Sequence, residues 1–217
     1  MLTVDQIQRQ FEAGEYEKLL RAVADNGMEL PLPLRIRLSQ GAVPTIALAL
    51  RRLVELTYGP TPLSHDMTDA LLARQAPDGA FVAGGDGPDP LATATAVAAL
   101  NQLIADHSAA ATAPIIQARD RALAALAQMQ DGDGLFHCPD DRDEAQRGLV
   151  AAFILSLLAG DEKCRATIRL ADLLNWFDQR LHRLDRDTAQ LYRLARAADP
   201  SRARKPRRRR ATTAAAA

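Results

Sequence analysis

Three side chains of the kinds that bind zinc follow one another closely in this sequence. They lie in the stretch His137-Cys138-Pro139-Asp140-Asp141, where the ligand types are His137, Cys138 and Asp140. Neighbouring residues rarely complete a tetrahedral site, and the chain has no Cys-x-x-Cys or His-x-x-x-His pair that would add ligands. We therefore expect an exposed polar loop without a metal ion here, and no cofactor elsewhere.

An acid and a hydroxyl group stand one helical turn apart further upstream. Asp89 and Thr93 lie at the start of a helix that we predict from about Pro90. In an enzyme that acts on an apolar substrate, these two side chains would line the pocket. The sequence contains no Gly-rich phosphate loop, no nucleophile elbow and no pair of catalytic carboxylates. It therefore lacks a complete set of catalytic groups.

The basic residues are concentrated near the C-terminus. Residues 202–210 hold seven of the 27 Lys and Arg residues and no acid, which leaves 20 basic against 27 acidic residues in the rest of the chain. An acidic body does not suit nucleic acid, so only the tail could bind phosphates or anionic lipid, non-specifically. The alternative is a tail that stays solvated. The anion-binding candidates are Arg207, Arg208, Arg209 and Arg210.

Length and composition favour one soluble helical domain. The chain has 217 residues, of which 47% are hydrophobic, and Leu and Ala dominate. No apolar run reaches the roughly 18 to 20 residues that span a bilayer, and the N-terminus lacks a secretory leader. Two cysteines make a weak case for a disulfide, so we expect a cytoplasmic protein.

Hydrophobic periodicity predicts helices along almost the whole chain. Half-exposed helices, expected at about 63–75 and 114–130, alternate with helices that are apolar nearly all round, at about 45–57, 90–106 and 144–158. This order indicates an outer and an inner layer of helices.

Further helices are predicted at each end of this core. We expect one domain over residues 1–199, with N-terminal helices in 1–41, a repeat core in 42–160 and C-terminal helices in 161–199. Within the last part, we predict one helix over about 162–183 and another over 187–198. Residues 200–217 have no apolar periodicity, and we expect them to be disordered.

One short pattern occurs twice, at an offset of 55 residues, between an outer and an inner helix. A fixed internal offset is typical of repeat architectures. Glycine would supply the positive φ that reverses the chain, aspartate would cap backbone amides, glutamine would bond helix ends and phenylalanine would seal the loop. We interpret both copies as structural. They are Gln75, Asp78, Gly79 and Phe81, and then Gln130, Asp133, Gly134 and Phe136.

The pattern Gln-x-x-Asp-Gly-x-Phe, followed by an inner helix, resembles the repeats of terpene cyclases and protein prenyltransferases over about residues 43–160. That resemblance implies an all-α fold of α/α hairpins, which in the family closes a toroid of about six hairpins. This chain has room for roughly half of them, so we expect an open arc. A second copy of the chain could complete the ring as a homodimer.

The resemblance also implies chemistry that this chain supports poorly. Cyclases of the family use an Asp-x-Asp-Asp motif, which neither the stretch 86–89 nor the stretch 140–143 matches, and aromatic residues make up only 4% of the chain. The prenyltransferases of the family hold a catalytic zinc ion, and the ligand types at His137, Cys138 and Asp140 do not complete such a site. We therefore expect a non-catalytic binding or scaffold protein, with a protein partner or an apolar small molecule on the concave side. The alternative is an enzyme on an isoprenoid or similar apolar substrate, with Asp89 and Thr93 in its pocket, and a third option is an accessory subunit docked through Trp176.

Overall fold

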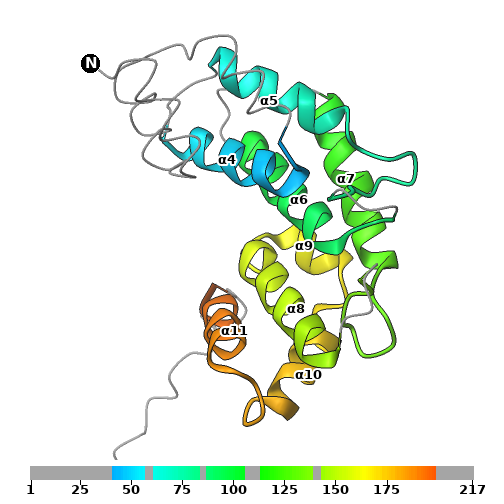
Figure 1. Ribbon diagram of the computed structural model, residues 1–217, viewed down its shortest axis with the longest axis vertical. Helices are drawn as coiled ribbons and strands as arrows, with labels where there is room; N and C mark the ends of the chain where they lie inside the picture. Colours follow the sequence, from blue (N-terminus) through cyan, green and yellow to red (C-terminus); the bar gives the residue numbers. More distant parts are fainter. Residues whose placement is uncertain (1–40, 57–60, 84–86, 106–112, 139–142, 199–217) are drawn as a thin grey trace, which may run out of the picture.

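The computed structural model describes residues 41–56, 61–83, 87–105, 113–138 and 143–198. This part of the chain is helical, which confirms the predicted all-α class (Figure 1). Its helices are α4 (Val43–Leu56), α5 (Pro62–Leu72), α6 (Pro90–Ala105), α7 (Ala113–Gln128), α8 (Glu144–Leu158), α9 (Glu162–Thr167), α10 (Leu170–Arg180) and α11 (Arg186–Ala198). None of these helices is both long and apolar enough to cross a membrane.

Side-chain caps decide where several helices begin. Thr61 and Ser64 form a capping box at the start of α5, in which each side chain accepts a hydrogen bond from the other residue's backbone N–H. Asp143 caps α8 by accepting from the backbone N–H of Gln146 at 2.8 Å. Asp161 caps α9 in the same way. Each cap satisfies a backbone donor that the helix itself leaves without an acceptor.

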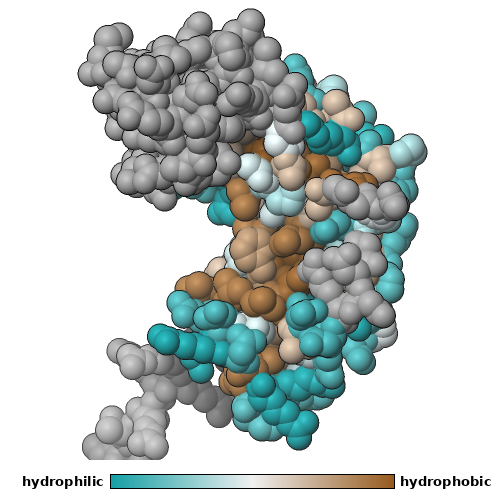
Figure 2. Space-filling model, viewed as in Figure 1, coloured by the Kyte–Doolittle hydropathy of each residue, from teal (hydrophilic) through white to brown (hydrophobic). Residues whose placement is uncertain are grey.

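The helices form two layers that follow a curve. In the inner layer, α6 packs between α4 and α8, and α8 packs against α11. In the outer layer, α5 covers α4 and α7 covers α6. Figure 1 shows α10 continuing the outer layer below α7, and Figure 2 shows that the molecule is hollowed on the side of the inner helices.

Burial differs between two of the predicted inner helices, α6 and α8. Every residue of α6 from Ala92 to Leu100 is buried, because α4, α7 and α8 all pack against this helix. Its small alanine side chains allow those neighbours to approach closely. In α8, by contrast, Leu149 is 41% exposed, and Phe153 and Leu157 are only partly buried. One face of α8 therefore remains open.

The predicted single helix over 162–183 is wrong, because the chain breaks at Ile168 and Arg169. Ile168 is extended, with φ −83° and ψ 151°, and separates α9 from α10. The backbone N–H of Arg169 donates instead to the side-chain oxygen of Gln130, at 2.7 Å. A distant glutamine thus takes the donor that a continuous helix would use internally.

The last helices extend the alternation beyond the predicted core. Outer helix α10 leads into inner helix α11, as α5 leads into α6 and α7 into α8. The connection is much shorter, however, and covers only residues 181–185. The expectations for the N-terminal helices and for the basic tail, including Arg207, Arg208, Arg209 and Arg210, lie outside the described residues.

Candidate functional site

The two copies of the repeated pattern adopt one loop conformation. In each loop the glutamine and the phenylalanine form an isolated β-bridge, and the glutamine side chain donates to the carbonyl oxygen of the glycine. The distance is 2.9 Å from Gln75 to Gly79 and 2.8 Å from Gln130 to Gly134. The two glycines have φ of +91° and +82°, a backbone region that residues with a side chain rarely adopt. The offset in the sequence is thus a repeat in three dimensions.

Each loop is attached to the outer helix of the next hairpin. Gln75 donates to the carbonyl oxygen of Ala118 in α7 at 2.7 Å. Gln130 accepts from the backbone N–H of Arg169, directly before α10. The glycines touch the same helices, since a Cβ at Gly79 would lie 2.6 Å from the carbonyl oxygen of Arg121. The loops therefore determine how consecutive hairpins stack.

Asp89 and Thr93 belong to the first of these loops. The hydroxyl of Thr93 accepts from the backbone N–H of Phe81 at 3.0 Å and donates to the carbonyl oxygen of Asp89 at 2.8 Å. The Asp89 carboxylate accepts from the backbone N–H of Ala92 at 2.9 Å and so caps α6. Both side chains are buried, Thr93 completely. They hold the loop against the inner helix.

The aspartates of the two loops differ in what they bond. Asp78 accepts from the backbone N–H of Ala80 at 2.9 Å. In the second loop Asp131 makes the corresponding bond, because it accepts from the backbone N–H of Asp133. Asp131 also forms an ion pair with Arg147 of α8. Asp133 itself is exposed. The second loop thus gains an ion pair that the first does not have among the described residues.

Replacing Gln130 with leucine is expected to lower the free energy of unfolding by about 1–3 kcal/mol, because one buried and one partly buried backbone group lose their partner. These groups are the N–H of Arg169 and the carbonyl of Gly134. Leucine has nearly the same size, so packing changes little. Urea denaturation measures the loss, and Gln128→Leu, at an exposed position of α7, is the control. Equal stability of the two variants would contradict the role assigned to Gln130.

The structure does not assemble a metal site from the described residues. His137 is exposed, Cys138 is buried with its sulfur 3.8 Å from the carbonyl oxygen of Phe136, and Asp140 lies outside the described residues. No group of three His, Cys, Asp or Glu side chains converges in the described part of the chain. The other cysteine, Cys164, is fully buried, and this burial raises the pKa of its thiol to about 12. That thiol is therefore not a nucleophile at neutral pH.

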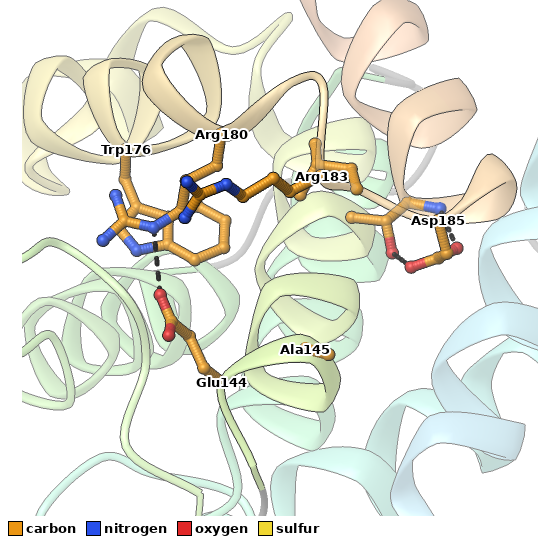
Figure 3. Close-up of a pocket in the computed structure, with 8 residues that line it drawn as sticks. Glu144, Ala145, Trp176, Arg180, Arg183 and Asp185 are labelled. Atoms are coloured by element: carbon orange, nitrogen blue, oxygen red, sulfur yellow. Dashed lines mark hydrogen bonds and ion pairs between the residues drawn. The ribbon is translucent and has the colours of Figure 1, made fainter.

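A pocket of about 270 Å³ opens where α8, α10 and α11 meet (Figure 3). Sequence analysis names Trp176 in this region, as a docking residue, and does not predict a pocket. No local pattern in the sequence indicates the pocket itself, although residues 181–185 lack the repeated loop pattern. The lining residues are Glu144, Ala145, Trp176, Arg180, Arg183, Leu184, Asp185 and Thr188.

Some polar groups of this pocket have hydrogen-bond or ion-pair partners, and one buried donor has none in the described part of the chain. Arg180 lies over the Trp176 ring, 4.8 Å from its centroid, and donates to Glu144 at 3.0 Å. The hydroxyl of Thr188 and its backbone N–H donate to Asp185, which lowers the pKa of this carboxyl group and commits it to capping α11. The indole N–H of Trp176 is buried and meets no acceptor among the residues that the structure describes.

The hollow side of the molecule carries hydrophobic surface along the inner helices (Figure 2). Two large side chains on these helices are exposed, Leu48 at 40% and Leu149 at 41%. Helices α6 and α11 pack against α8 and leave one of its faces partly open. Leu149, Phe153 and Leu157 follow one another on that face at helical spacing.

No protein-family model matches this chain, and comparisons with curated proteins and with solved structures gave no significant match. The resemblance to cyclase and prenyltransferase repeats therefore stays a prediction from the sequence.

Proposed function

We propose that this protein is a non-catalytic binding module, and that its hollow side takes an apolar segment of a partner protein. The observation that supports this proposal most directly is the hydrophobic surface along the inner helices. We assign the partly open face of α8 to this surface, where Leu149 is 41% exposed and Phe153 and Leu157 are half-buried. Stacked helical hairpins provide such an extended concave surface, and apolar patches on it mark interaction sites.

A protein segment fits this surface better than a small apolar molecule does. Pockets for small molecules usually bury most of the ligand in a cleft. The hydrophobic surface extends across several inner helices. An extended apolar segment, such as one face of an amphipathic helix, would cover more of it.

The enzyme alternative has less support. It requires an acid at the start of an inner helix that faces a substrate cavity. Asp89 caps α6, and Thr93, fully buried, bonds the backbone of Phe81. Both side chains are used to hold the first loop.

Replacing Leu149 with glutamate is expected to abolish retention of the partner while changing the free energy of unfolding by less than about 1 kcal/mol, because a charge at an exposed position disrupts an apolar interface but not the core. The measurement is co-purification of the full chain from its native source, with the bound proteins and small molecules identified by mass spectrometry. The matched control is Leu181→Glu, which places the same charge at 39% exposure at the C-cap of α10, outside the inner helices.

The comparison between these variants decides the proposal. A protein retained by the wild type and by Leu181→Glu, but lost from Leu149→Glu, supports it. Proteins retained equally by all three chains would overturn it. Retention of an apolar small molecule instead of a protein would show that the occupant has been assigned to the wrong class.

A further inference from the structure

The pocket between α8, α10 and α11 lies at the hairpin that lacks the repeated loop. In the first two hairpins, the connections cover residues 73–89 and 129–143 and return a fully buried phenylalanine to the helix ends. The third connection covers only residues 181–185 and contains neither a phenylalanine nor a glutamine. It is too short to fill the space between its helices, and the pocket is lined by three of its residues.

One positive charge in this pocket has no acid partner among the described residues. Of the two carboxylates in the lining, Glu144 pairs with Arg180, and Asp185 accepts from the first turn of α11. The described hydrogen bond of Arg183 goes to the imidazole of His182, at 3.2 Å. Figure 3 shows the Arg183 side chain extending along the pocket toward Trp176 and Arg180. Two guanidinium groups therefore belong to the pocket, and of these only Arg180 pairs with a carboxylate among the described residues.

The rest of the lining selects the kind of anion. Trp176, Leu184 and Ala145 give the pocket an apolar part, and the indole N–H of Trp176 is a buried donor that no described acceptor meets. Arginine binds planar carboxylates through paired N–H groups. The carboxylates of Glu144 and Asp185 would repel a dianion such as phosphate. Their repulsion of a monoanion is weaker, because a monoanion carries half the charge.

We propose that this pocket binds a small organic carboxylate, with Arg183 as the principal partner of its charged group and the Trp176 wall against its apolar part. The volume of about 270 Å³ lies just below the usual range for drug-sized ligands, which fits a molecule about the size of benzoate. The proposal does not rest on partner binding at the hollow side, because none of its lining residues is one of the hydrophobic side chains on which that proposal depends.

Trp176 provides a direct measurement, because it is the only tryptophan in the chain. Benzoate added to the full chain is expected to change the tryptophan fluorescence saturably and to shift the single indole N–H signal in an NMR spectrum. Arg183→Gln is expected to weaken this binding at least about tenfold, because a charge-assisted hydrogen bond is lost. Arg193→Gln removes the same charge from an exposed position on α11 outside the pocket, and it should change the affinity less than about twofold.

Two further probes test the chemistry of the ligand. Benzyl alcohol has a similar shape without the charge, and inorganic phosphate has the charge without the apolar part. Circular dichroism of Arg183→Gln checks that the variant keeps its helices, as its exposed position leads us to expect. The proposal fails if benzoate causes no saturable change, if benzyl alcohol or phosphate binds as well as benzoate, or if the two arginine variants behave alike.

Discussion

Gly134→Ala is expected to lower the free energy of unfolding by about 2–5 kcal/mol. Two effects contribute to this loss: residues with a side chain disfavour a positive φ, and the added methyl group clashes with a neighbouring helix. Gly134 has φ +82°, and a Cβ there would lie 2.8 Å from the backbone nitrogen of Leu173. That neighbour is backbone of α10 and cannot rotate away. Chemical denaturation measures the loss.

Gly132→Ala is the matched control for this variant. It changes the same residue type two positions earlier in the same loop, where a Cβ would meet nothing within 4 Å. We expect its free energy of unfolding to stay within about 0.5 kcal/mol of the wild type. In the first loop, Gly79→Ala should resemble Gly134→Ala, since its Cβ would lie 2.6 Å from the carbonyl oxygen of Arg121. Equal stability of Gly132→Ala and Gly134→Ala would mean that the loops do not fix the stacking of the hairpins.

Phe136→Ala is expected to cost about 3–5 kcal/mol, because Phe136 is completely buried and its removal leaves a cavity between the second loop and the inner helix. Phe136→Leu, which keeps most of the volume, should cost less than about 1.5 kcal/mol. The midpoints of urea unfolding curves for the full chain give both values.

Phe153→Ala separates the effect of burial from that of losing an aromatic ring. Phe153 lies on the partly open face of α8, so we expect a clearly smaller loss of stability than at Phe136. If the two alanine variants lost the same stability, the repeated phenylalanine would not be the core residue of its loop. Phe153→Ala should also weaken partner binding at the hollow side, since its side chain lies beside Leu149 on the helix.

These variants connect the loops to the proposed function. The glutamines and glycines attach each hairpin to the next outer helix, through Ala118 and Arg121 in α7 and through Arg169 and Leu173 at α10. The curvature of the inner layer depends on these attachments, because they set the position of one hairpin relative to the next. A loosened loop would therefore change the shape of the hollow as well as the stability.

Much of the architecture was predictable because it depends on local rules. Apolar periodicity located the helices of the repeat core, and α8 begins and ends where we predicted it to. The two Asp-Gly loops were recognisable because only glycine readily takes the positive φ found at Gly79 and Gly134. Such signals need no knowledge of distant neighbours.

The function of individual polar residues was harder to predict. Asp89 and Thr93 stood out as candidate catalytic groups, since an acid and a hydroxyl near a helix start fit both catalysis and capping. Only their partners distinguish these roles, and the partners are the backbone groups of Phe81 and Ala92. The pocket beside Trp176 involves three helices whose proximity no local pattern indicates.

By itself, the sequence determined the helical class, the alternation of outer and inner helices and the form of the repeated loop, because all three follow from spacing and from residue types within a few positions. Tertiary structure alone decided where the chain departs from helical periodicity. Gln130 breaks a predicted helix at Arg169 because it competes for a backbone donor 39 residues away. The open pocket arises likewise from the packing of α8, α10 and α11 around a short connection, and that packing is a property of the whole fold.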